Sequence, residues 1–202
     1  SDTLNDAYQA AGFVTRNRDI KNMHGNIQPR KNVVLYYDGR GEGAEPITND
    51  IELMTHFKRD YRNQIRRATK DGVTVTSGDT QDDVRAFFDT YVMMAAAQGI
   101  THRPINYFLH MQNLWQKTGL FKVFLAHFEG QVIASGIGFS YGDEIWYMYA
   151  GSNRQYAKHY GPYAVQWEML KWGLSLGKVE YDFGGCLLYT SDAADDGESV
   201  DL

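Results

Sequence analysis

Basic residues recur at helical spacing in the stretch NDIELMTHFKRDYRNQIRRATKDG, and they include Arg62, Arg66, Arg67 and Lys70. Lysine and arginine side chains on one helix face can follow the phosphate backbone of a nucleic acid. The same pattern occurs on helix faces that are merely solvated, and carboxylates that include Glu52, Asp60 and Asp71 dilute the charge here. We interpret the basic face as solvated and keep contact with nucleic-acid phosphate as the alternative.

A second candidate for anion binding is the segment THRPINY, in which Thr101 and Arg103 precede Pro104. Proline is common in the first turn of a helix, so Pro104 predicts that a helix begins directly after these two residues. Arginine can bind phosphate oxygens through two parallel hydrogen bonds, and the free N–H groups of a helix N-terminus favour the same anion. The alternative is that Arg103 is a surface cation and Thr101 a helix cap.

Two tyrosines, Tyr147 and Tyr149, alternate with Met148 in the stretch EIWYMYAGS. Alternate residues of a β-strand point to the same face, so we expect both phenols on one face of a sheet. There they can stack on a sugar or a base and still donate hydrogen bonds. The alternative is that they pack on the sheet as ordinary β-forming residues.

The sequence lacks the residue patterns that several other kinds of catalytic or binding site require. The six histidines are scattered, without the spacing of a metal site, and no GxSxG, P-loop or GxGxxG motif is present. Asp182 ends a predicted strand in VEYDFGG, where a catalytic carboxylate could sit. We interpret it instead as a residue that holds the turn by hydrogen bonds to local backbone. We therefore expect neither a metal nor a cofactor.

The elements that must position these residues alternate irregularly between strand and helix. We predict strands at 33–37, 73–78, 120–129, 131–141, 144–152 and 178–185, and helices at 50–71, 80–99, 104–119 and 162–177. Tight turns join the three central strands, so they should form an antiparallel meander. The order from Val73 to Gly185 predicts an α/β (α+β) fold with a mixed, mostly antiparallel sheet flanked by helices.

Composition narrows the class of protein. Hydrophobic residues make up 43% of 202 residues, which suffices for a sizeable core. No apolar stretch approaches the roughly 20 residues of a membrane span, and we see no secretion signal. The single cysteine, Cys186, suits a reducing compartment, so we expect a cytoplasmic protein. The net charge of −5 equals that of residues 187–202 alone, so the rest of the chain is neutral.

Taken together, five stretches resemble the Fem family of peptidoglycan-bridge aminoacyltransferases, in family order from about residue 12 to 185: NVVLYYD, RNQIRRATKDGVTV, GITHRPINYF, WYMYAGS with YGPYAVQWEMLKWGLSLG, and VEYDFGG. The resemblance implies a GNAT-like fold. It also implies transfer of an aminoacyl group from a charged tRNA to the stem-peptide amine of a peptidoglycan precursor, by aminolysis of an ester and without a cofactor. The short segment between the two central helices leaves no room for a helical arm, so the match is to the armless branch.

The resemblance also implies which residues bind the substrates. Thr101, Arg103, Tyr107, Tyr147 and Tyr149 would face the muropeptide acceptor, whether UDP-linked or lipid-linked. The aminoacyl-tRNA donor would be the nucleic acid that the basic face, with Arg62, Arg66, Arg67 and Lys70, can contact. No catalytic residue is assigned, and neither the oligomeric state nor the transferred amino acid is predicted.

Members of the Fem family consist of two acyltransferase-like domains. The resemblance therefore implies domain boundaries for this chain. We expect 1–72 to be part of a first domain, 73–186 a second domain, and 187–202 a non-native acidic tail. A Phe-Lys pair that follows DFGG in the family is absent here, so we expect impaired activity. Two alternatives stay open: an acyl-CoA-dependent GNAT N-acyltransferase, and a non-catalytic muropeptide-binding module. The stretch HYGPYAVQW lacks the R/Q-x-x-G-x-G/A pattern that cradles coenzyme A, which argues against the first alternative.

Overall fold

The computed structural model describes residues 2–12, 32–40 and 45–184. In chain order its elements are α1 (Asp2–Ala10), β1 (Val34–Tyr36), α2 (Asp50–Thr55), α3 (Arg59–Lys70), β2 (Thr74–Gly78), α4 (Gln81–Gln98), α5 (Ile105–Trp115), β3 (Phe121–Phe128), β4 (Gln131–Tyr141), β5 (Glu144–Ser152), the 3₁₀ helix η2 (Arg154–His159), α6 (Gly161–Ser175) and β6 (Glu180–Asp182). The predicted order of strands and helices from residue 73 onward is confirmed.

The strands form one mixed sheet in the order β1-β6-β5-β4-β3-β2. Neighbouring strands are antiparallel except for β5 and β6, which are parallel. The parallel pair arises because α6 carries the chain back from the end of β5 to the start of β6. The predicted fold class, including the antiparallel meander of β3, β4 and β5, is confirmed.

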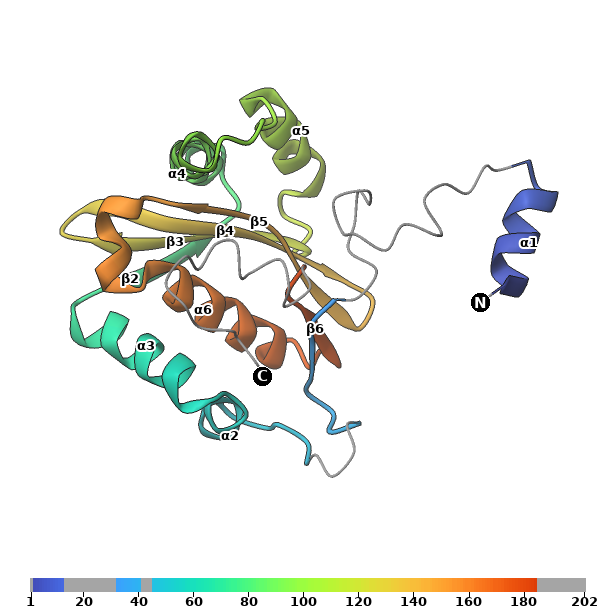
Figure 1. The fold of residues 1–202 in the computed structure, drawn as a ribbon, viewed down its shortest axis with the longest axis horizontal. Helices are drawn as coiled ribbons and strands as arrows, with labels where there is room; N and C mark the ends of the chain where they lie inside the picture. Colours follow the sequence, from blue (N-terminus) through green and yellow to red (C-terminus); the bar gives the residue numbers. More distant parts are fainter. Residues whose placement is uncertain (1, 13–31, 41–44, 185–202) are drawn as a thin grey trace.

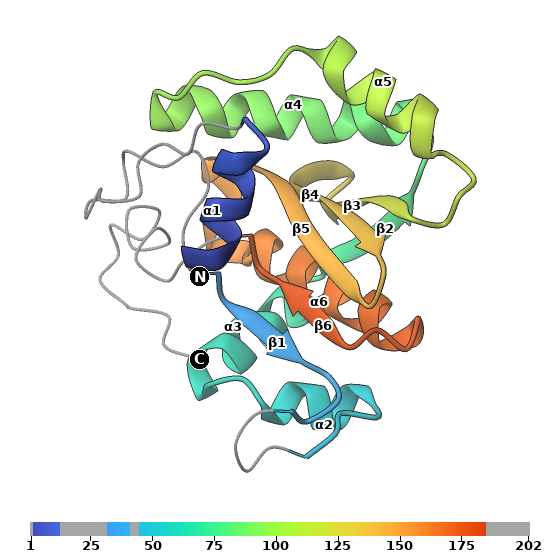
Figure 2. The ribbon, with the colours of Figure 1, turned by 90° about the vertical axis from the view of Figure 1, so that its right-hand side faces the viewer.

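Helices cover both faces of the sheet (Figure 1). α4 and α5 lie on one face, where Val84, Phe87 and Phe108 are buried against β3, β4 and β5. α6 lies on the other face, with α2 and α3 outside it, and buries Met169 and Leu170. Figure 2 shows the same layers from the side of β1 and β6. Each functional residue of a strand can therefore be assigned to the α4–α5 face or to the α6 face.

The single helix predicted over residues 50–71 is wrong, because the structure has two helices there. α2 begins after Asn49, whose side chain accepts hydrogen bonds from the next turn, and it ends at Thr55. The backbone leaves the helical region at Lys58, with a ψ of 156°, before α3 begins. Phe57 is buried at this turn and stacks on Tyr61 at 4.7 Å. The apolar spacing of four residues continues across the break, so periodicity does not reveal it.

Residues on both sides of position 72 share one sheet. Leu35 in β1 pairs with Tyr181 in β6, and the Tyr37 hydroxyl donates to the Leu170 carbonyl oxygen of α6 at 2.8 Å. Rings of Tyr61 on α3 and Tyr163 on α6 meet at 5.0 Å. The domain boundary at residue 72 stays a prediction. The expected tail at 187–202 lies outside the described residues.

Candidate functional site

Three of the predicted binding residues meet on the α4–α5 face of the sheet. The hydroxyl oxygens of Tyr107 on α5 and Tyr149 on β5 are 2.9 Å apart. The Arg103 guanidinium lies over the Tyr107 ring, with its central carbon 4.6 Å from the ring centroid. One cation and two phenols from segments far apart in the sequence thus form a single cluster, which we call the Arg103 cluster.

Aromatic packing holds this cluster in place. Tyr149 contacts Phe108 and Tyr91 edge-on, with ring centroids 5.1 and 6.3 Å apart. The Arg103 backbone N–H donates to the Tyr91 hydroxyl at 3.4 Å. Burial raises the pKa of Tyr149 to about 12, the Tyr107 hydroxyl adds to the rise, and Arg103 opposes it. Tyr149 therefore stays protonated at neutral pH and can donate a hydrogen bond.

The loop before α5 completes one side of the cluster. α5 begins at Ile105, with Pro104 as the N-cap residue rather than the first helical residue, and no side chain caps its backbone N–H groups. These groups lie close to Arg103 in sequence, so they can join it in binding an anion. Thr101 is exposed in the same loop, and no hydrogen bond links it to the described residues. Its predicted role as a binding residue stays untested.

Tyr147 does not belong to the Arg103 cluster. We expected Tyr147 and Tyr149 on one face of the strand, and this is wrong. Tyr149 pairs with Ile137, whereas Tyr147 pairs with Gly138, so Met148 has no partner in the ladder. Such a β-bulge inserts one extra residue and reverses the alternation of side chains beyond it. Tyr147 accordingly packs on the α6 face and Tyr149 on the α4–α5 face.

On the α6 face, Tyr147 belongs to a buried group of phenols around Gln166. The Tyr181 hydroxyl donates to Gln166 Oε1 at 3.0 Å, and Tyr147 is hydrogen-bonded to the same side chain. Burial raises the pKa of Tyr147 to about 12, and the bond to Gln166 opposes that rise. Because Tyr147 lies on β5 and Tyr181 on β6, Gln166 ties the two parallel strands to α6.

Asp182 holds the turn that follows β6. Its carboxylate accepts hydrogen bonds from the Gly184 backbone N–H at 2.7 Å and from the Asn32 side chain at 2.6 Å. The interpretation of Asp182 as a residue that bonds to local backbone is therefore confirmed. Gly184 has a φ of 71°, and a Cβ there would collide with the Tyr147 carbonyl oxygen. Only glycine suits this position, where the chain passes directly against β5.

Sequence reasoning missed a carboxyl group beside these strands. Glu144 pairs with Glu180 across β5 and β6, and Asp182 lies two residues further along β6. Burial raises the pKa of Glu144 to about 7, and the negative charges of Glu180 and Asp182 add to the rise. Glu144 can therefore exchange a proton near neutral pH. No motif marks it, because the parallel pairing that brings the carboxylates together exists only in the folded chain.

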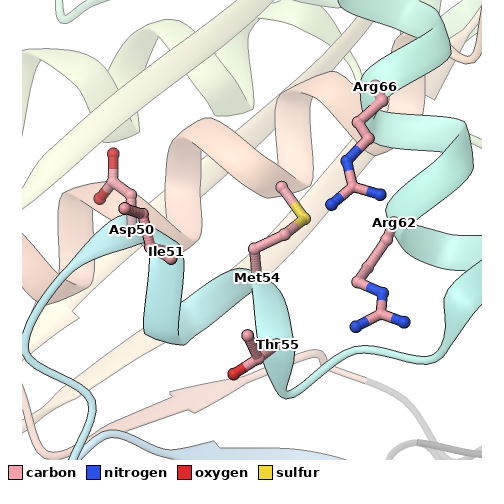
Figure 3. A pocket seen from close by; sticks show the side chains of 6 residues that line it. All are labelled: Asp50, Ile51, Met54, Thr55, Arg62 and Arg66. Atoms are coloured by element: carbon pink, nitrogen blue, oxygen red, sulfur yellow. The ribbon is translucent and has the colours of Figure 1, made fainter.

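The four basic residues of α3 do not share one environment. Arg62 and Arg66 line a groove of about 290 Å³ between α2 and α3, with Asp50, Ile51, Met54 and Thr55 (Figure 3). The Arg67 guanidinium instead lies over the Tyr160 ring, 5.5 Å from its centroid. Lys70 is exposed in the last turn of the helix. Contact of these residues with RNA stays a prediction.

Two kinds of feature are absent from the described ranges. No three histidine, cysteine or acidic side chains gather there in a way that could hold a metal ion. In the same residues, no helix has the length and apolar character needed to cross a membrane.

Comparison with known proteins places the fold. A family described as the acetyltransferase (GNAT) domain matches residues 55–196. The chain belongs to this family. The match covers α3, the Arg103 cluster and the parallel pair β5–β6, and it extends into the segment that we expected to be a tail.

One curated relative confirms the resemblance of this GNAT protein to the Fem family, and one solved structure shares its fold. The UDP-N-acetylmuramoylpentapeptide-lysine N(6)-alanyltransferase of Weissella viridescens is 40% identical over 198 residues, which are 97% of this chain and 55% of the relative. The crystal structure of FemX superposes with a TM-score of 0.74 at 19% identity, over 92% of this chain and 60% of FemX. The GNAT protein therefore spans about half the length of its curated relative.

A second solved structure also shares the fold. A conserved protein of unknown function from Bacteroides thetaiotaomicron has a TM-score of 0.50 at 11% identity, over 66% of this chain and 47% of that protein. The structural similarity is thus more extensive to FemX than to this second structure.

Proposed function

We propose that this GNAT protein takes part in the transfer of an aminoacyl group from aminoacyl-tRNA to the stem-peptide amine of a peptidoglycan precursor. Support comes from the 40% identity to an enzyme named for alanyl transfer to the lysine of UDP-N-acetylmuramoylpentapeptide. The observation that carries the proposal is the convergence of Arg103, Tyr107 and Tyr149 beside an uncapped helix N-terminus.

The Arg103 cluster has the chemistry that the acceptor needs. A UDP-linked muropeptide carries a diphosphate between a nucleoside and an amino sugar. The guanidinium of Arg103 and the first N–H groups of α5 can bind the phosphate oxygens. The phenols of Tyr107 and Tyr149 can contact a ring and donate hydrogen bonds, because both remain close to solvent at the edge of the cluster. We propose that Thr101 also contacts the acceptor, and that Tyr147 stabilises β5 by packing on its α6 face.

The reaction is aminolysis of the ester that joins the amino acid to tRNA. The uncharged stem-peptide amine attacks the ester carbonyl, a C–N bond forms, and the C–O bond to the tRNA ribose breaks. The proton lost by the amine is taken up by the departing ribose oxygen. No covalent enzyme intermediate is needed because the ester is already activated, and correct orientation of the two substrates can lower the barrier by about 7–11 kcal/mol.

Titration calorimetry tests the acceptor site. UDP-linked muropeptide is titrated into the wild-type chain, the Arg103→Ala variant and the Arg85→Ala variant. Arg85 is exposed on α4 and is the matched control. We expect Arg103→Ala to weaken binding by at least about tenfold, since a charge-assisted contact to phosphate is lost, and Arg85→Ala to bind as the wild type does. Equal affinities for all three would remove Arg103 as the anchor.

A transfer assay separates this function from the alternatives. Alanyl-tRNA and acetyl-coenzyme A are offered as donors with UDP-linked or lipid-linked muropeptide as acceptor, and the product mass is measured. The family match by itself favours an acyl-CoA-dependent enzyme, and transfer from acetyl-coenzyme A would identify that function. Binding of the acceptor without transfer from either donor would identify a non-catalytic binding module. Cytoplasmic location stays a prediction.

A further inference from the structure

The groove between α2 and α3 contains two guanidinium groups without an acidic partner. Figure 3 shows Arg62 and Arg66 on the same side of the groove, with the Met54 side chain between them and Asp50. Within the described part of the chain, no carboxylate lies within ion-pair distance of either arginine. Two unpaired positive charges therefore face a hollow on the surface.

Arg62 is held there at a cost to stability. Its Nε is buried and has no hydrogen-bond acceptor among the described residues. A buried donor without a partner typically costs about 1–3 kcal/mol. The same side chain lines the groove, where a bound anion can accept hydrogen bonds from the rest of its guanidinium.

The positive charge continues beyond the groove along one side of α3. Arg59, Arg62, Arg66 and Lys70 follow one another at intervals of three or four residues. They form a row along about 16 Å of the helix axis, at 1.5 Å per residue. Three acids lie near this row. Asp50 lines the same groove but forms no ion pair with Arg62 or Arg66 among the described residues, Asp60 is the acid in the first turn of α3, and Asp71 is 3.2 Å from His159. A row of this length suits a chain of phosphates better than a single small anion.

We propose that the α2–α3 groove binds the phosphate backbone of the RNA that carries the acyl group, through Arg62 and Arg66. The proposal rests on the proposed function, because that function requires an RNA donor. The groove is distinct from the proposed acceptor site, since α3 lies outside α6 whereas the Arg103 cluster lies on the opposite face of the sheet (Figure 1). Arg67 is not part of the groove, because its guanidinium lies over Tyr160.

The test measures RNA binding by fluorescence anisotropy over a series of salt concentrations. The probe is an RNA hairpin with the sequence of a tRNA acceptor arm. The proteins are the full 202-residue chain, the single variants Arg62→Gln and Arg66→Gln, the double variant, and Arg85→Gln as the control on the other side of the sheet. Thermal unfolding shows that each variant folds.

We expect both single variants to bind RNA more weakly, and the slope of log affinity against log salt to fall by about 1 for each. Arg85→Gln should keep the wild-type slope. Unchanged slopes in Arg62→Gln, Arg66→Gln and the double variant would overturn the proposal. Binding to phosphatidylglycerol vesicles that depends on both arginines, with no RNA binding, would overturn it too and would assign the groove to a membrane surface.

Calorimetry with the UDP-linked muropeptide keeps the two proposals distinct. If the arginine variants lose RNA binding and the wild type does not bind the muropeptide, the RNA site in the groove is supported. The proposal that the protein binds a muropeptide acceptor is then contradicted. If the wild type binds the muropeptide but RNA binding does not depend on Arg62 and Arg66, only the proposal for the α2–α3 groove is contradicted.

Discussion

The phenolic oxygens of Tyr107 and Tyr149 lie 2.9 Å apart and join α5 to β5 next to the bulge at Met148. A hydrogen bond between neutral hydroxyl groups contributes about 0.5–1.5 kcal/mol. We expect a double-mutant cycle with Tyr107→Phe and Tyr149→Phe to show a coupling energy at the lower end of this range, because Tyr107 is 36% exposed. Urea unfolding measures it. Strictly additive effects would mean that the two hydroxyls do not stabilise each other.

Gly136 in β4 is expected to tolerate no side chain. A Cβ at this position would lie 2.9 Å from Val165 Cγ1 and 3.0 Å from the Tyr147 ring. Gly136→Ala should lower the free energy of unfolding by about 1–3 kcal/mol, as overpacking of a core usually does. Combined with Val165→Ala, which makes room, Gly136→Ala should cost less than it does alone. Equal costs of Gly136→Ala in both backgrounds would contradict this view of the packing.

Arg62 should limit stability in the absence of RNA. Arg62→Met removes the buried Nε that has no acceptor, so we expect the free energy of unfolding to rise by about 1 kcal/mol. Arg66→Met is the matched control, since Arg66 is exposed and has no such atom. Chemical denaturation of the two variants compares them directly. A loss of stability in Arg62→Met, with none in Arg66→Met, would show that the guanidinium is satisfied in solution.

Glu144 should make stability depend on pH. Its pKa is raised from 4.5 to about 7, so the folded protein binds a proton more tightly than the unfolded chain. The stabilisation from this protonated carboxyl is fully present below pH 4.5 and is lost as the pH rises through about 7. Glu144→Gln lacks this loss, and its amide oxygen can still accept the hydrogen bond from the Trp146 indole.

Melting temperatures of Glu144→Gln and the wild type, measured across this pH range, check the prediction. The variant should match the wild type at the acid end and become the more stable protein above neutral pH. A difference between the two that stays constant with pH would show that Glu144 titrates normally.

Local sequence signals predicted much of the fold. Glycine turns and alternation identified β3, β4 and β5, and THRPINY placed Arg103 directly before a helix. Asp182 was correctly interpreted as the residue that holds its turn. These features depend on residues within a few positions of one another, so the backbone preferences of the segment itself decide them.

Only the tertiary structure decided how these elements combine. The bulge at Met148 moved Tyr147 to the opposite face from Tyr149, because register depends on the partner strand and not on the strand's own sequence. The break between α2 and α3 is another such feature, since the apolar spacing runs through it unchanged. The sequence by itself determined the order and type of the strands and helices from residue 73 onward, because local backbone preferences and turn residues suffice for that. Long-range packing determined where the helix over 50–71 breaks and which side chains share a site.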